Sequence, residues 1–141
     1  MNKNFYTFEI EKYGDERGSL ISLENPKNIP FEIKRIYYIL DVKEEKKRAC
    51  HAHRDSQRVL IALAGKCCVK VFDGTNEMNV KLDNPQKALY FNKGVWCELS
   101  NFAEDTIILA LSSHIYYESE YIRNYDDFLK SKKSNCAHKN I

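Results

Sequence analysis

Short segments rich in β-branched and aromatic residues, separated by turn residues, run through most of the chain. Such segments are typical of β-strands, because branched and aromatic side chains pack well on a pleated surface. We predict nine strands, at residues 5–10, 19–23, 34–42, 58–63, 66–72, 77–82, 88–91, 95–99 and 106–111. Nine short strands at nearly even spacing indicate an all-β sandwich or barrel.

Two local patterns support this interpretation. The pair Asp73-Gly74 lies between two alternating segments and predicts a hairpin, because both residue types tolerate the positive φ of a tight turn. Within 66–72, Cys67, Val69 and Val71 alternate with two lysines, which predicts one buried face and one face exposed to water or ligand.

Only the C-terminal end has a helical pattern. Asn124 is a suitable N-cap, and Tyr125, Phe128 and Leu129 form an apolar stripe behind it. From Ser131 onward the sequence is polar, and we expect a frayed tail over 131–141. Residues 1–141 have no internal repeat or linker, so we expect a single domain.

Composition excludes several classes of protein. The chain has 22 basic and 20 acidic residues among 141, too balanced for an electrostatic nucleic-acid binder. It contains no apolar segment of the ~20 residues that a membrane helix needs, and residues 1–14 do not resemble a signal peptide. Five cysteines without a CxxC pair predict neither a disulfide framework nor a zinc knuckle. We therefore expect a soluble, reduced, cytoplasmic protein with no membrane or nucleic-acid partner.

The densest group of chemically active residues is Arg48-Ala49-Cys50-His51-Ala52-His53-Arg54. Residues two apart on a strand project from the same face, so His51 and His53 would be neighbours. Two imidazoles on an inward face can bind a metal or move protons, whereas on an exposed edge they would be ordinary polar residues. The flanking arginines favour an anionic ligand.

The HxH pattern, followed later by Gly94-Val95-Trp96, resembles the double motif of the cupins. A metal-binding cupin adds a Glu after the two histidines and a His in its second motif; this chain has Gln57 and Cys97 there. Because two of four ligands are replaced and an amide is a poor substitute for a carboxylate, we expect no metal and a histidine pair that is catalytic without one.

A closer resemblance covers nearly the whole chain. It rests on five strings in this order: Arg17-Gly18-Ser19-Leu20, Asn28-Ile29-Pro30-Phe31, Lys34-Arg35-Ile36-Tyr37-Tyr38, His51-Ala52-His53 and Tyr121-Ile122-Arg123-Asn124-Tyr125-Asp126. Together they resemble the dTDP-4-dehydro-6-deoxyglucose 3,4-ketoisomerases, which are metal-independent cupins. The resemblance implies a cupin jelly roll with a short C-terminal helix and a homodimer with exchanged N-terminal strands. It also implies a dTDP-linked 4-keto-6-deoxy sugar in the barrel mouth and no cofactor.

The implied reaction moves a ketone from C4 to C3 of the sugar through an enediol, as a step in deoxyaminosugar biosynthesis. It needs a base for the proton at C3, an acid for reprotonation at C4 and a donor to the developing oxyanion. His51 and His53 supply the acid and the base, and the sequence leaves open which one is the carbon base. Only one of Tyr37 and Tyr38 can face the cavity, and the resemblance implies that Tyr37 is the hydroxyl donor to the sugar; otherwise Tyr37 belongs to the core or to an interface.

The remaining predicted site residues would bind the substrate. Arg48 is the expected ligand of phosphate or of a sugar oxygen, and Arg17 resembles a nucleotide-contacting arginine donated across the dimer. The other predicted binding residues are Arg35, Lys70, Trp96, Tyr121 and Arg123. Each has a structural alternative: Arg35 and Lys70 can face solvent, Trp96 can belong to the core, and Tyr121 and Arg123 can dock the C-terminal helix.

Two other functions stay open at this point. One is a related dTDP-sugar 3,5-epimerase, which usually pairs one His with an Asp and a distant Tyr in a longer chain. The other is a non-catalytic ligand-binding cupin, which would need the arginines but not two titrating histidines.

Overall fold

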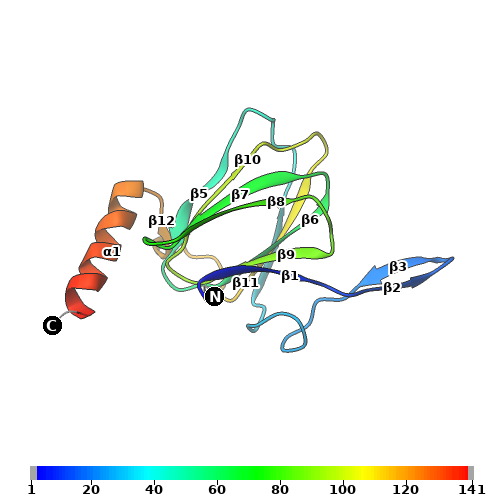
Figure 1. The fold of residues 1–141 in the computed structure, drawn as a ribbon, viewed down its shortest axis with the longest axis horizontal. Coiled ribbons are helices and arrows are strands. Elements are labelled where there is room, and N and C mark those ends of the chain that lie inside the picture. Colours follow the sequence, from blue (N-terminus) through cyan, green and yellow to red (C-terminus); the bar gives the residue numbers. More distant parts are fainter. Residues whose placement is uncertain (1–2, 140–141) are drawn as a thin grey trace.

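Two five-stranded antiparallel sheets face each other in the computed structural model, which describes residues 3–139 (Figure 1). The first sheet contains, in spatial order, β1 (Phe5–Glu9), β9 (Lys87–Phe91), β6 (Arg58–Ala64), β11 (Ile107–Ser112) and β4 (Arg35–Ile39). The second contains β12 (Tyr121–Ile122), β5 (Arg48–His53), β10 (Trp96–Ser100), β7 (Cys67–Phe72) and β8 (Glu77–Leu82). The predicted all-β jelly roll is confirmed.

The main core lies between the sheets, because both sheets direct alternate residues inward. Its buried members include Leu60, Leu89 and Ala110 from the first sheet and Val69, Val71 and Leu99 from the second. The segment between β3 (Gly18–Ile21) and β4 covers the outer face of the first sheet, where Ile29 and Phe31 pack near Val59 and Ile61. Each sheet therefore has one face for the interior and one for a covering segment.

Most predicted strands are present, and their differences from the sequence analysis are local. Residues 77–82 form β8 as predicted, and Cys67, Val69 and Val71 of β7 are buried as expected. The Asp73-Gly74 hairpin is confirmed; the Asp73 carboxylate accepts hydrogen bonds from the backbone of Thr75 and Asn76. Residues 12–15, between the predicted strands 5–10 and 19–23, form a further strand that was not predicted.

That strand belongs to a separate hairpin, formed by β2 (Lys12–Asp15) and β3 (Gly18–Ile21). The hairpin extends away from the two sheets as an arm (Figure 1). Its residues are exposed except for the half-buried Ile21, and they include Tyr13 and Leu20. An arm with no core of its own buries little of its apolar surface within this chain.

The helix α1 (Tyr125–Lys139) follows a 3-10 turn, η1 (Glu118–Glu120), and β12. Asn124 caps it as predicted, since its side-chain oxygen accepts a hydrogen bond from the Asp127 amide. The helical backbone continues through residues 131–139, where the sequence predicts a frayed tail. Within residues 3–139, no helix has the length and apolar character needed to cross a bilayer.

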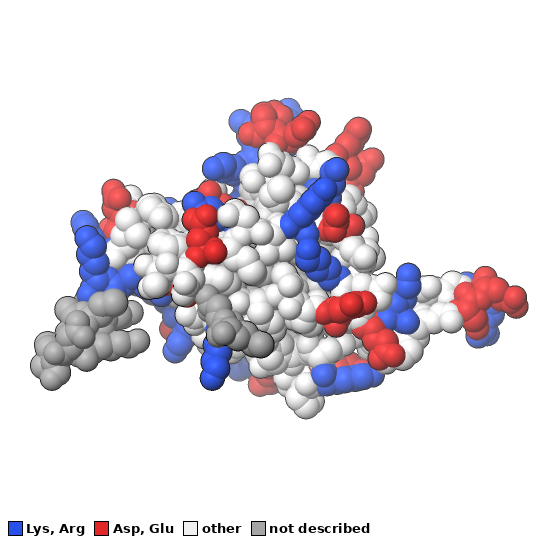
Figure 2. Space-filling view, viewed as in Figure 1, with Lys and Arg blue, Asp and Glu red and all other residues white. Residues whose placement is uncertain are grey.

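Charged side chains of both signs are interspersed over the face shown in Figure 2. This distribution agrees with the balanced composition and does not resemble the basic stripe of a nucleic-acid binder.

Candidate active site

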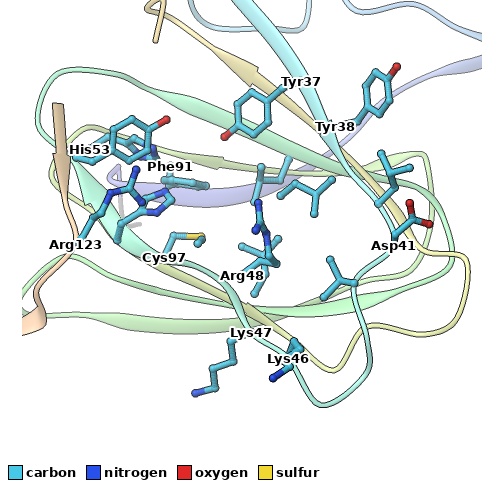
Figure 3. A pocket seen from close by; sticks show the side chains of 18 of the residues that line it. Tyr37, Tyr38, Asp41, Lys46, Lys47, Arg48, His53, Phe91, Cys97 and Arg123 are labelled. Atoms are coloured by element: carbon cyan, nitrogen blue, oxygen red, sulfur yellow. The ribbon is translucent and has the colours of Figure 1, made fainter. Parts of the chain in front are cut away.

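A cavity of about 790 Å³ opens between the two sheets. Its lining comes from β4, β6 and β9 of the first sheet, from β5, β10 and β12 of the second, and from the loop 40–47 and Arg123 (Figure 3). Seven of the predicted site residues line it: Arg35, Tyr37, Arg48, His51, His53, Tyr121 and Arg123. Strands distant in the sequence thus bring most of the expected site together.

His51 and His53 face the cavity because β5 alternates around Ala52, which packs in the cluster beneath α1. Just before them the strand bulges: Cys97 of β10 pairs with His51, and Glu98 pairs with Ala49, so Cys50 is the extra residue. Ala49 and Cys50 have φ angles of 67° and 54°, which side chains other than glycine rarely adopt. This bulge sets the direction in which His51 enters the cavity.

The two imidazoles lie edge to face, with ring centroids 4.6 Å apart. Burial, together with nearby arginines, lowers the pKa of His51 to about 4 and that of His53 to about 2. Neither ring nitrogen of His53 has a hydrogen-bond partner among the described residues. At neutral pH both imidazoles are therefore uncharged, and each can accept a proton from a ligand.

Tyr37 and Tyr38 point in opposite directions, as expected for neighbours on a strand. Tyr37 points into the cavity, whereas Tyr38 points outward and is 63% exposed (Figure 3). The Tyr37 hydroxyl accepts a hydrogen bond from Arg58 Nε at 3.2 Å. Burial raises the pKa of Tyr37, and the Arg58 guanidinium opposes that rise. Tyr37 is therefore a protonated hydroxyl at neutral pH, available as a donor.

Tyr121 completes a cluster of three rings with the histidines. Its ring centroid lies 4.9 Å from that of His51 and 4.8 Å from that of His53. Its hydroxyl accepts hydrogen bonds from Arg35 at 3.0 Å and from Arg58 at 3.4 Å. The guanidinium of Arg123 lies 4.6 Å from the Tyr121 ring centre and pairs with Glu118. Arg35 and Arg123 thus hold Tyr121 beside the histidine pair.

Arg48 differs from the other two cavity arginines. Its side chain has no hydrogen bond or ion pair with another residue in the described part of the chain, and it points into the cavity (Figure 3). Lys43, Lys46 and Lys47 also belong to the lining, in which Asp41 is the only acidic residue. The cavity therefore has a cationic mouth, suited to an anion such as a diphosphate.

Comparison with known proteins identifies the family. The model of a family described as "FdtA: WxcM-like, C-terminal" matches residues 3–133. The chain belongs to this family. A curated relative from Aneurinibacillus thermoaerophilus, TDP-4-oxo-6-deoxy-alpha-D-glucose-3,4-oxoisomerase, is 45% identical over 121 residues, which are 86% of this chain and 87% of that protein.

Two solved structures are closely similar. One is a 3,4-ketoisomerase from Helicobacter canadensis, with 43% identity, a TM-score of 0.89 and coverage of 92% of this chain and 98% of that one. The other is QdtA, a sugar 3,4-ketoisomerase from Thermoanaerobacterium thermosaccharolyticum in complex with TDP, with 34% identity, a TM-score of 0.90 and coverage of 96% and 98%.

Two departures from the metal-binding cupin motif occupy different places in this FdtA-family protein. Cys97 lines the cavity, and burial raises the pKa of its thiol far above the ordinary value. Gln57 lies outside the lining, and its side-chain oxygen accepts a hydrogen bond from the Tyr90 hydroxyl. No group of three or more His, Cys, Asp or Glu side chains within the described residues could hold a metal ion.

Trp96 and Lys70 lie outside the cavity, contrary to prediction. Because Cys97 faces inward, strand alternation turns Trp96 outward. There its ring packs against Phe128 of α1, and its indole N–H donates a hydrogen bond to the Glu98 carboxylate. Lys70 pairs in register with Glu98 and lies 3.5 Å from Glu77, on the same outer face. Neither residue belongs to the lining of this cavity.

Arg17 also lies away from the cavity of its own chain. It occupies the turn at the tip of the β2–β3 arm, where it hydrogen-bonds the Asp15 carboxylate at 2.7 Å. That interaction lowers the pKa of Asp15, although both side chains are exposed. The predicted contact of Arg17 with a nucleotide bound to a second subunit therefore stays a prediction.

The sequence analysis missed Arg58, which is fully buried directly behind Tyr37 and Tyr121. A signal for it exists in the sequence: Arg58 starts the apolar strand 58–63 and shares a face with Leu60, a cavity residue. A cation on the inner face of a buried strand indicates a polar site, because burial of a charge is costly.

Proposed function

We propose that this protein is a dTDP-4-dehydro-6-deoxyglucose 3,4-ketoisomerase, an enzyme that moves the keto group from C4 to C3. The observation that carries the proposal is the pair of uncharged imidazoles facing one cavity, 4.6 Å apart. Membership of the FdtA family supports the substrate, since relatives with that activity match most of the chain.

The chemistry requires only proton transfers. One imidazole accepts the proton from C3, and the electron pair forms a C3–C4 double bond as O4 becomes an oxyanion. O4 gains a proton while the C3 hydroxyl loses one, and C4 is protonated as the C3 carbonyl forms. C3 is oxidised and C4 is reduced within one molecule, so no external oxidant or reductant takes part. Two adjacent neutral imidazoles suit this sequence, since each carries one nitrogen that can accept a proton and one N–H that can donate one.

The tyrosines supply the donors that the enediolate oxygens need. Tyr37 lines the cavity with its hydroxyl directed inward (Figure 3), and the ring of Tyr121 lies against both histidines. A hydroxyl donor at a developing oxyanion stabilises the transition state more than the substrate. We propose that these two hydroxyls serve the oxygens on C3 and C4.

The diphosphate would bind at the cationic mouth. Arg48 is the best ligand, because its guanidinium has no protein partner among the described residues to give up. Lys43, Lys46 and Lys47 add positive charge to the lining. In this arrangement the sugar extends from the diphosphate toward the histidines.

The two alternative functions have less support. A 3,5-epimerase that uses a His–Asp pair would need a carboxylate beside the histidines, and Asp41 is the only acidic residue in the lining. A binding cupin would not require a buried imidazole such as that of His53, which has no hydrogen-bond partner among the described residues and is costly to keep.

The test is an NMR time course in D2O with chelator-treated protein and dTDP-4-dehydro-6-deoxyglucose. We expect signals of a 3-keto sugar with deuterium at C4, and the couplings would give the C4 configuration. His51→Asn and His53→Asn should each abolish turnover yet still bind TDP, while His114→Asn, outside the cavity, should turn over like the wild type.

Other outcomes would refute specific parts of the proposal. Deuterium at C3 and C5 without movement of the ketone would indicate an epimerase. TDP binding without any new sugar would indicate a binding protein. Turnover that depends on added divalent metal would overturn the expectation of a metal-free site.

We further propose a homodimer in which the β2–β3 arm packs on the second copy. The arm exposes Tyr13 and Leu20, and edge strand β4 exposes Ile36 and Tyr38 at more than 60% each. Exposed apolar residues on an arm and a sheet edge are suited to mutual burial in a symmetric pair. The cytoplasmic location expected from the sequence stays a prediction.

A further inference from the structure

Arg58 is a buried cation without a carboxylate partner. Its side chain is completely inaccessible on the central strand β6, and none of its nitrogens lies within 4.0 Å of an acidic oxygen in residues 3–139. Its donors go to hydroxyl oxygens instead: Nη1 to Ser56 and Ser112, Nε to Tyr37 and Nη2 to Tyr121. Burial of a charge is costly unless hydrogen bonds compensate for the lost water. Here the four hydroxyl groups provide that compensation.

These hydrogen bonds fix the direction of two hydroxyl protons. Arginine has donors only, so Tyr37 and Tyr121 must present lone pairs to it. The Tyr121 oxygen receives a second guanidinium donor from Arg35 at 3.0 Å. No described residue accepts a hydrogen bond from either phenol. Both O–H groups are therefore directed away from Arg58, and both phenols border the cavity.

We propose that Arg58 is a positioning residue that turns the Tyr37 and Tyr121 hydroxyls toward the substrate as two preoriented donors. This inference rests on the proposed ketoisomerase function, whose enediol carries oxygens on two adjacent carbons. Arg58 does not line the cavity, so it acts through the phenols. Donors that are already oriented need no reorganisation when charge develops on the sugar oxygens.

Lysine cannot replace this arrangement, because a single ammonium lacks the planar fork that reaches both phenols and both serines at once. Arg58→Lys should therefore lower kcat about 30-fold and leave KM and TDP affinity nearly unchanged, since the lost interaction is made in the transition state. Arg54→Lys is the control. Arg54 is exposed and its guanidinium donates a hydrogen bond to the Ser119 carbonyl, so this variant should keep the wild-type kcat.

The deciding measurement is the effect of Arg58→Lys in three backgrounds: Tyr37→Phe, Tyr121→Phe and Tyr90→Phe. Tyr90 is the matched control, because its hydroxyl donates to Gln57 and lies outside the cavity lining. If Arg58 acts through the cavity phenols, its effect on kcat should shrink from about 30-fold to below about 5-fold in the first two backgrounds and persist in the third.

A purely structural role for Arg58 would give the same factor in all three backgrounds, and that result would overturn the inference. If Arg58→Lys fails to fold, Ser56→Ala removes one guanidinium anchor and carries the same comparison with a smaller factor. If the wild type is active and Arg58→Lys lowers kcat by the same factor in all three backgrounds, only the positioning role is refuted. A wild type that binds TDP without isomerising the sugar refutes the proposed function and this inference together.

Discussion

His53 is only 2% exposed, and both of its ring nitrogens lack hydrogen-bond partners among residues 3–139. An unsatisfied buried polar group destabilises the folded state. Its presence in a native protein therefore indicates a functional role. The same burial keeps the imidazole uncharged and lowers its pKa to about 2. In this state the lone pair is neither protonated nor occupied at neutral pH, which leaves it available to accept a proton.

This burial predicts a pH dependence of stability. An unfolded histidine has a pKa near 6.5, so the unfolded state binds more protons than the folded state below that pH. Stability should therefore be fully present above about pH 6.5 and should fall as the pH drops toward 4. Thermal unfolding measured from pH 7.5 to 4.5 should show a shallower loss of Tm in His53→Asn than in the wild type. Equal slopes would contradict the neutral, buried state of His53.

At the scale of elements, α1 and the cavity occupy opposite faces of β5 and β10. Ala52 and Trp96 face the helix, whereas His51, His53 and Cys97 face the cavity. Phe128 is completely buried against this outer face, with its ring centroid 5.5 Å from Trp96 and 6.0 Å from Phe72. The helix thus supports the strands that carry the histidine pair and does not line the cavity.

Removal of the Phe128 ring should separate stability from catalysis. Phe128→Ala should lower the free energy of unfolding by about 3 kcal/mol, because it leaves a cavity beside Trp96. Urea unfolding at a fixed protomer concentration measures this loss, with exposed Lys130→Ala as a control expected within about 0.5 kcal/mol of the wild type. The kcat of the folded variant should stay unchanged; a large loss of kcat would mean that the helix also shapes the site.

The same elements show why sequence patterns predicted part of this architecture. Strands with apolar alternation, such as β7 and β8, were predictable because their buried faces are continuous. β5 was absent from the nine predicted strands, since its cavity face carries histidines and its bulge interrupts the alternation at Ala49 and Cys50. Trp96 was predicted to bind the ligand. The sequence motif gives its position in the chain but does not show which face of β10 its side chain occupies.

At the scale of the whole molecule, the sequence could not locate residues whose roles depend on long-range contacts. Arg58 meets Tyr37 and Tyr121 only after three strands assemble, so no local spacing connects them. Arg17 presents the opposite case: the family strings predict a role for it, yet the fold of one chain holds it on an exposed arm. Both residues depend on assembly, one within the chain and one, by our proposal, between chains.

If Arg17 completes the partner's site, two inactive variants should restore each other. Arg17→Ala lacks the donated arginine, and His53→Asn lacks its own imidazole. In a mixed dimer, the site of the Arg17→Ala chain would combine intact histidines with the Arg17 of the other chain. Random exchange of two subunit types makes half of the dimers mixed, each with one functional site, so activity should recover to about a quarter of the wild-type value.

The measurement is the ketoisomerase rate after the two variants are mixed, unfolded and refolded together, compared with each variant refolded alone. Recovery requires both dimerisation and donation across the interface, whereas an Arg17 that served its own chain would leave every dimer inactive. A chain that sediments as a 16.5 kDa monomer would exclude the exchange itself. The exposed Asp15–Arg17 pair suits this role, because a diphosphate can replace one carboxylate as the partner of the guanidinium at little cost in desolvation.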